Sequence, residues 1–276
     1  MKIAYVTWDG PDDDRELLLT EWERAGIDGS AVRWDDPGAD WSGFDAAVVR
    51  SPWNYVDHRQ EFVGWVRRAS AVTRLLNPPA VLERNTDKTY LREFAELGIP
   101  IVPTHWVGPG DAVSLPQWDD YVVKPTVSAG ARGAIRTADV SEAALHAKKL
   151  VAEGKVAMVQ PYLDMVEAEG ETSLLYFGGE FSHALRRDAM LADGTAPPRS
   201  NHVRAELRDP APDQFELAER VLGMIPEPLL YARVDLVRLP GGTPALIELE
   251  LTEPYLYLAA APGTATRLTT ALLALL

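Results

Sequence analysis

The stretch Glu248-Leu249-Glu250-Leu251-Thr252-Glu253-Pro254 decides the fold, together with Arg233-Val234-Asp235 on the apolar run before it. Residues two apart on a strand point to the same face, so Glu248 and Glu250 share a side, and an antiparallel neighbour can place Asp235 beside them. Two like charges about 4 Å apart repel by about 4 kcal/mol at an effective dielectric of about 20. The pattern therefore favours a bound cation or an acid with a raised pKa. An exposed strand face with solvated glutamates is the structural alternative.

Two lysines precede these acids in the chain. Carboxylate oxygens suit Mg²⁺, which commonly bridges protein carboxylates and substrate phosphates, so a phosphate site is expected nearby. Lys124 ends an apolar run and leads into the small-residue loop 126–133, where backbone N–H groups can approach a phosphate closely. Lys88 is the second candidate. An ordinary surface hairpin is the alternative for the loop, which is not a Walker loop because no Gly-Lys-Thr or Gly-Lys-Ser follows its glycines.

An apolar strand running into a proline lies between the lysines and the acids. Met158-Val159-Gln160-Pro161-Tyr162-Leu163 can offer backbone N–H and C=O groups to an adenine edge and an apolar side chain to its face. Glu171 follows Gly170 and can reach ribose hydroxyls, or it is only a turn carboxylate.

The rest of the chain alternates strands and helices. The first third gives the strand, helix and strand order of a parallel sheet, and ligand loops of such sheets lie at the carboxyl ends of the strands. Asn77-Pro78-Pro79 then breaks the chain, Thr86 is expected to cap a helix running to Gly98, and a strand is expected over 99–107. A mobile loop is expected over 189–202. We therefore expect an amino-terminal α/β domain (1–84), a small central α+β domain (85–161) and a carboxyl-terminal antiparallel-sheet domain (162–276).

Composition excludes several classes of protein. The 276 residues include 27 basic and 41 acidic side chains, for a formal charge of −14, and no cysteine. Acidity disfavours nucleic acid, and the lack of cysteine removes thiol nucleophiles, thiolate metal sites and disulfides. Neither a signal peptide nor a membrane-spanning run is apparent, so we expect a cytoplasmic protein that binds no membrane. A homo-oligomer is left open.

In this order, the motifs resemble the ATP-grasp superfamily, and most closely its branch of glutathione synthetases and ribosomal-protein-modifying enzymes. The resemblance runs from about Lys88 to Pro254, and the family often carries E-x-N-x-T-x-P where this chain has Glu250 in place of asparagine. It implies three domains, with ATP held between the last two. It also implies transfer of phosphate from ATP to a substrate carboxylate, followed by attack of an amine on the acyl phosphate.

The resemblance also implies roles for individual residues. ATP would be bound by Lys88, Lys124, Ser128, Gly130, Gly133, Gln160, Pro161, Tyr162, Leu163 and Glu171. Mg²⁺, in two ions for which Mn²⁺ can substitute, would be held by Asp235, Glu248 and Glu250. The catalytic step is assigned to Arg186, Arg233 and Asn201, although Arg187 is as well placed in the sequence as Arg186 to neutralise an acyl phosphate.

A narrower resemblance is to the cyclo-ligases that close O-ureido-D-serine into D-cycloserine. It rests on Arg50-Ser51-Pro52-Trp53-Asn54-Tyr55, on Asn77-Pro78 before Asn85-Thr86-Asp87-Lys88, and on Glu248-Leu249-Glu250. It implies a small amino-acid-like substrate that supplies both the carboxylate and the nitrogen, with loss of carbon dioxide and ammonia. An intermolecular amino-acid ligase and a nucleotide-binding module without turnover are the alternatives.

Substrate contacts are expected near two loops. Arg50, at a predicted strand end, can bind a carboxylate through two hydrogen bonds. The alternative is an ordinary arginine at the edge of the sheet or on a helix. Ser51 and Asn54 follow it in the same loop. His202 is a candidate substrate residue and general base in the loop expected to close over the substrate.

Overall fold

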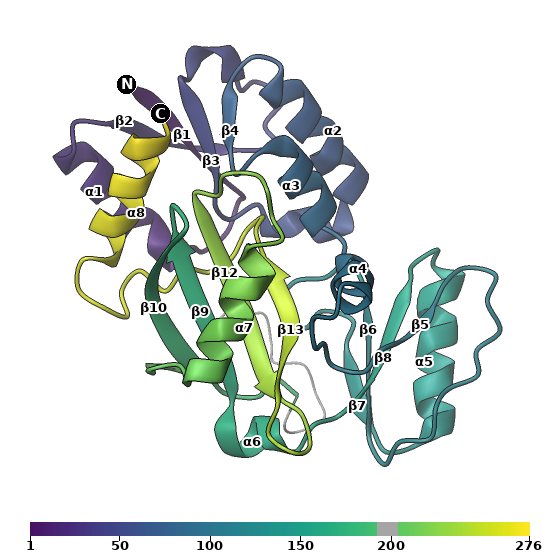
Figure 1. Cartoon of the computed structure of the whole chain (residues 1–276). Helices are drawn as coiled ribbons and strands as arrows, with labels where there is room; N and C mark the ends of the chain where they lie inside the picture. Colours follow the sequence, from purple (N-terminus) through teal and green to yellow (C-terminus); the bar gives the residue numbers. More distant parts are fainter. Residues whose placement is uncertain (192–203) are drawn as a thin grey trace.

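The computed structural model describes residues 1–191 and 204–276, and these residues build three sheets (Figure 1). The first sheet is parallel, with strand order β2-β1-β3-β4. Both faces of β1 are buried. Side chains alternate along the strand, so Ile3 and Tyr5 pack in one hydrophobic core while Ala4 and Val6 pack in another. The elements of this unit are β1 (Lys2–Thr7), α1 (Asp13–Arg24), β2 (Asp28–Arg33), β3 (Ala46–Val49), α2 (Arg59–Ser70), β4 (Arg74–Leu76) and α3 (Pro79–Asn85).

The last helix of the chain returns to this first sheet. Leu268 and Leu272 of α8 (Thr264–Leu275) pack with Ile3 and Tyr5, and α8 lies along α1 (Figure 1). Phe62 of α2 packs on the opposite face of the sheet. One wall of the amino-terminal core is thus supplied by the last residues of the sequence.

The second sheet is small and antiparallel, with order β5-β8-β6-β7. One face is covered by α5, whose first turn is capped by Asp139 through a 2.7 Å hydrogen bond to the Ser141 amide. Its elements are β5 (His105–Val107), β6 (Tyr121–Pro125), β7 (Ile135–Thr137), α5 (Val140–Ala152) and β8 (Ala157–Pro161).

The expected helix from Thr86 to Gly98 and the expected strand over 99–107 are both wrong in part. The hydroxyl of Thr86 donates to the Glu83 carbonyl at the end of α3, and the Lys88 amide donates to the Thr126 carbonyl. These contacts hold a turn, so the next helix, α4 (Tyr90–Glu96), begins later. The strand is restricted to 105–107, since Pro100 and Pro103 have no amide hydrogen for a ladder.

The third sheet is antiparallel, with order β11-β10-β9-β12-β13. One face, which includes Leu174 and Leu236, packs against Leu217 of α7. Together with the parallel first sheet, it confirms the expected α/β fold class. Among the described residues, no helix is both long and apolar enough to cross a bilayer. The elements are α6 (Met165–Glu169), β9 (Glu171–Phe177), β10 (Glu180–Arg187), β11 (Ala205–Leu207), α7 (Pro212–Leu222), β12 (Tyr231–Arg238) and β13 (Pro244–Glu250).

Asn77 joins the first sheet to the third. Its amide nitrogen donates to the carbonyls of Tyr231 (2.9 Å) and Leu251 (2.8 Å). Its amide oxygen accepts from the Leu230 amide at 2.7 Å. Because Asn77 is fully buried, each of these bonds replaces water that the side chain has lost. The position of β13 relative to the amino-terminal unit is therefore fixed by hydrogen bonds as well as by apolar packing.

His183 ties β10 to the segment after β13, and we expect it to make stability depend on pH. Its Nε2 lies 3.2 Å from the Leu256 carbonyl oxygen, so Nε2 carries the proton. Burial lowers the pKa of His183 from 6.5 to about 4. The unfolded chain binds this proton first, so stability falls as pH drops from about 6.5 to about 4, by about 3 kcal/mol at most.

Thermal melts of His183→Gln across this pH window check the expectation. The variant should show a shallower fall of Tm on the acid side than the wild-type chain. His58→Gln, at an exposed histidine, is the control and should keep the wild-type slope. A wild-type slope in the His183 variant would contradict the assignment.

Candidate functional site

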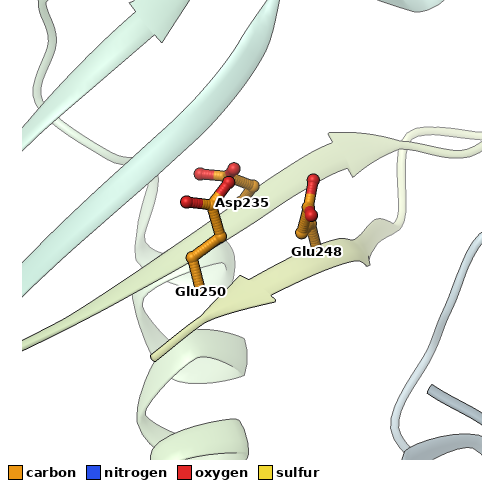
Figure 2. A group of neighbouring side chains, drawn as sticks. All are labelled: Asp235, Glu248 and Glu250. Atoms are coloured by element: carbon orange, nitrogen blue, oxygen red, sulfur yellow. The ribbon is translucent and has the colours of Figure 1, made fainter. Parts of the chain in front are cut away.

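Three carboxylates converge on one face of the third sheet. β12 and β13 pair with Asp235 opposite Glu248 and with Arg233 opposite Glu250. Asp235, Glu248 and Glu250 each offer an oxygen, and these oxygens lie within 4.8 Å of one another (Figure 2). We call these three residues the acid face. The structure thus brings together the three acids that the sequence singled out.

Asp235 is the fully buried centre of the acid face. It accepts hydrogen bonds from Ser173 Oγ (2.7 Å), Arg187 (2.7 Å) and Arg233 (3.0 Å). Burial alone would raise the pKa of Asp235, but Arg187 and Arg233 outweigh it and hold the pKa below its usual value. Asp235 is therefore a fixed, ionised carboxylate.

At Glu250, the positive charge of Arg233 does not outweigh burial and the neighbouring acids. It is hydrogen-bonded to Arg233, yet burial, helped by the charges of Glu248 and Asp235, raises the pKa of Glu250 to about 8. A divalent cation beside it would hold it ionised. The donor set consists of hard carboxylate oxygens, so these residues fit Mg²⁺.

Lys88 links the acid face to the central unit. Its ammonium lies 3.0 Å from a carboxylate oxygen of Glu248 and donates to the Ser128 carbonyl oxygen at 2.6 Å. Burial alone would lower the pKa of Lys88, but the Glu248 carboxylate raises it above the usual value, so the ammonium stays charged. Through these two contacts, Lys88 joins β13 to the loop that follows β6.

Lys124, on β6, is the second cation of the site. Burial lowers the pKa of Lys124, the charge of Glu248 opposes this shift, and the charge of Lys88 adds to it. Within the described part of the chain, the Lys124 ammonium makes no hydrogen bond or ion pair. A desolvated ammonium without a directly bonded acceptor is costly unless an anion joins it, so this position suits a phosphate.

Arg187, and not Arg186, faces the acids, which corrects the sequence-based choice of Arg186. Arg187 bridges Glu171 (2.5 Å) and Asp235 (2.7 Å). Alternation along β10 turns Arg186 to the other face, where it pairs with Asp188 instead. The sequence offered two adjacent arginines, and only the pairing register decides between them.

The small-residue loop after β6 reaches the amino-terminal unit. Gly130, Ala131 and Gly133 all have positive φ, at 60°, 56° and 73°. Between them, Arg132 donates to Asp57 (3.0 Å) and to the Trp53 carbonyl (2.7 Å). Arg132 was not among the predicted site residues, because nothing in its immediate sequence distinguishes it from a surface arginine.

The segment expected at adenine ends β8. The Gln160 side chain is buried and donates to Thr104 Oγ1 at 2.8 Å. The Tyr162 ring lies under the Arg136 guanidinium, 3.3 Å from it, and the Tyr162 amide donates to the Asp120 carbonyl. Pro161 closes the strand, and Leu163 is buried in an apolar cluster. A nucleotide base would therefore meet an ordered segment.

The structure does not bring the candidate substrate residues of the first unit to the acid face. Arg50 is buried, donates to the Pro254 carbonyl at 2.6 Å, and lies over the Tyr231 ring. Ser51 donates to Asp12 at 2.5 Å, and Asn54 is bonded to Trp34 and Asp35. Of these three residues, Arg50 alone has buried side-chain nitrogens, Nε and Nη1, without a hydrogen-bond partner. Asn201 and His202 lie outside the described residues, as does most of the loop expected to close over the substrate.

Glu253 is a further acid of the site, to which the sequence analysis gave no role. Its side chain is hydrogen-bonded to the phenol of Tyr55, and its carbonyl oxygen accepts from Trp53 Nε1 at 3.0 Å. Burial raises the pKa of Glu253 to about 7. The sequence feature that could have pointed to Glu253 is its position in Thr252-Glu253-Pro254, shortly after Glu248 and Glu250.

The fold is that of the ATP-grasp ligases. The ATP-grasp ligase PsnB, solved with a phosphomimetic variant of its minimal precursor, Mg and ADP, superposes with a TM-score of 0.64 at 15% identity. That superposition covers 98% of this chain and 97% of PsnB.

The particular family follows from closer relatives. Residues 3–77 match the family model of the D-cycloserine synthetase DcsG amino-terminal domain. The cycloserine biosynthesis protein DcsG of Streptomyces lavendulae is 36% identical over 279 aligned residues, which cover 95% of this chain and 93% of that protein. A crystal structure of D-cycloserine synthetase DcsG superposes with a TM-score of 0.89 at 34% identity, over 99% of this chain and 98% of that chain. The chain belongs to the D-cycloserine synthetase family, and it is a ligase.

Proposed function

We propose that this ligase uses ATP and Mg²⁺ to activate the carboxylate of O-ureido-D-serine as an acyl phosphate and closes it into D-cycloserine. The products besides the ring are ADP, phosphate, carbon dioxide and ammonia. The observation that carries the proposal is the placement of Lys88 and Lys124 against the acid face, with Lys124 lacking a partner among the described residues. Membership in a family of cycloserine biosynthesis proteins supports this substrate.

The proposal assigns each unit a part. Residues 1–84 hold the amino-acid substrate, and residues 85–161 and 162–276 hold the nucleotide between them. Lys88, Lys124 and the loop from Ser128 to Gly133 take the phosphates, while the segment from Gln160 to Leu163 borders adenine. Glu171 reaches the ribose with the carboxylate oxygen that Arg187 leaves unused.

Asp235, Glu248 and Glu250 would hold Mg²⁺, which supplies positive charge that neutralises the phosphates when bound. The chain's own residues do the rest by position and charge. Arg187 and Arg233 are fixed by Asp235, so their guanidinium groups are held in place before the substrate arrives. Such preorganised charge stabilises a developing anion without reorganisation during the reaction.

Ring closure within one molecule suits this arrangement. The nucleophilic nitrogen is carried by the activated substrate, so its effective concentration is high and no pocket for a second amine is needed. An amino-acid ligase that joins two molecules would need that second pocket. The alternative without turnover is set aside, because the chain is a ligase.

ADP release by the purified chain, measured with ATP, Mg²⁺ and a panel of small amino acids, tests the proposal. O-ureido-D-serine alone should give ADP and D-cycloserine in equal amounts, with no second organic substrate. Its L-isomer and D-serine are the controls. AMP as a product would contradict the phosphoryl-transfer step, and ADP release that requires an added amine would assign the chain to intermolecular ligation instead.

A further inference from the structure

Five buried or half-buried acids belong to the site, and four of them have a cation. Glu248 pairs with Lys88, and the other three pair with arginines. The arginine-paired acids are Glu171, Asp235 and Glu250. Among the described residues, Glu253 has no ion pair, and its side chain is hydrogen-bonded only to the Tyr55 phenol. Glu253 is thus the one site acid that is not neutralised by an adjacent cation.

Glu253 lies where the substrate unit meets the phosphate site. Its residue is 9% exposed, and its backbone is tied to Trp53 of the amino-terminal unit. Lys88, Glu248 and Arg233 are near enough to act on the charge of its carboxyl group. Tyr55 is itself buried and holds the carboxyl in one orientation. The carboxyl is therefore fixed between the unit assigned to the amino acid and the residues assigned to the phosphates.

The unpaired state of Glu253 decides what it can do. A carboxylate paired with arginine or bound to a metal holds a proton weakly, whereas a desolvated carboxylate without a cation is a stronger base. Attack of a nitrogen on an acyl phosphate releases a proton, and this proton needs an acceptor within reach. The other four acids are each engaged by a cation of the chain, and three of them are assigned to Mg²⁺ or to an arginine that the proposed phosphoryl transfer needs. Glu253 is the site acid that is left free to accept the proton.

We propose that Glu253 is the general base that removes the proton from the attacking nitrogen during ring closure. The inference rests on the proposed function. The nitrogen bonded to the substrate's side-chain oxygen forms a C–N bond with the activated carbonyl carbon, and its N–H proton passes to a Glu253 carboxylate oxygen. The C–O bond to the phosphoryl group breaks, and its electron pair leaves with phosphate. Water then removes the carbamoyl group as carbon dioxide and ammonia.

This role separates two steps that most site variants would impair together. Acyl-phosphate formation depends on the lysines, the acid face and the arginines, whereas Glu253 acts only afterwards. In Glu253→Gln, ring formation should fall by about 10²- to 10⁴-fold, the usual contribution of a general base. Acyl-phosphate formation should stay within about twofold of the wild-type rate.

Two measurements on the full chain follow these steps separately. ATP with ¹⁸O in the β,γ-bridge reports reversible acyl-phosphate formation through positional isotope exchange, and chromatography reports D-cycloserine. Hydroxylamine, a nucleophile that needs no base, should trap the acyl phosphate as a hydroxamate at the wild-type rate. Glu253→Asp should recover part of the ring formation, and Glu180→Gln, at an exposed acid of the same sheet, is the control. Thermal melts should show an unchanged or higher Tm for Glu253→Gln, since the amide buries no charge.

Ring formation at the wild-type rate in Glu253→Gln would overturn the inference. A parallel loss of isotope exchange and ring formation would also overturn it, because Glu253 would then hold the substrate or Lys88 rather than accept a proton. If the wild-type chain gives no ring product from O-ureido-D-serine, the proposed function fails, and the inference fails with it.

Discussion

Glu248→Gln is expected to abolish nearly all ADP formation while the chain stays folded. The variant removes one charge from the acid face and weakens the 3.0 Å contact to Lys88. Loss of one preorganised charge at a phosphoryl-transfer site costs about 10³-fold in turnover, and loss of a metal ligand adds to it. Excess Mg²⁺ should restore only part of the rate, because the neutral amide still binds the ion weakly.

The same variant should lower the free energy of unfolding. Burial alone would raise the pKa of Glu248, but Lys88 and Lys124 hold it below the usual value, which means that the ionised form stabilises the fold. Glu248 is 26% exposed, so about 1–3 kcal/mol is expected, with solvent reducing the value. Steady-state ADP release and a thermal melt measure the two effects, and Glu180→Gln is the control for both. Wild-type turnover at ordinary Mg²⁺ would remove Glu248 from the metal site.

Lys124→Met is expected to weaken ATP binding without destabilising the chain. A charge-assisted hydrogen bond to phosphate contributes about 1.5–3 kcal/mol, so the Kd for ATP should rise by about 10- to 150-fold. Since burial lowers the pKa of Lys124 and no described residue pairs with it, replacing the ammonium by a thioether leaves no group unsatisfied. The Tm should stay unchanged or rise.

Comparison with Lys88→Met makes this test specific. Lys88 is bonded to Glu248 and Ser128, so its loss should reduce both the Tm and the affinity for ATP. Titration calorimetry with a non-hydrolysable ATP analogue gives the affinities, and Lys155→Met, at an exposed turn, is the control. An unchanged affinity in Lys124→Met would argue against a phosphate site at this lysine.

Local patterns in the sequence were sufficient to predict the strands that carry the site. Because side chains alternate across a strand, Glu248 and Glu250 could be placed on the same face of β13. An antiparallel partner strand could then add Asp235 to that face. In the structure β12 and β13 pair in this way, with Asp235 opposite Glu248. Both strands can be predicted from the alternation of apolar residues and from the turn residues between them, which are local features of the sequence.

Long-range contacts decided what the sequence left open. Arg186 and Arg187 differ only in which face of β10 they occupy, and that depends on the register with β9. Thr86 looked like a helix cap, but the contact between Lys88 and Thr126 holds its surroundings in a turn. The role proposed for Glu253 depends on its hydrogen bond to Tyr55, which lies far away in the sequence. No local pattern carries such information.

The position of α8 has a consequence for how this protein can be made. Leu268 and Leu272 close the hydrophobic layer over Ile3 and Tyr5, so the first strand emerges from the ribosome long before its covering exists. The first sheet therefore lacks part of its apolar cover until α8 has been translated. A fragment that holds the first sheet without α8 would leave that layer open to solvent and to aggregation.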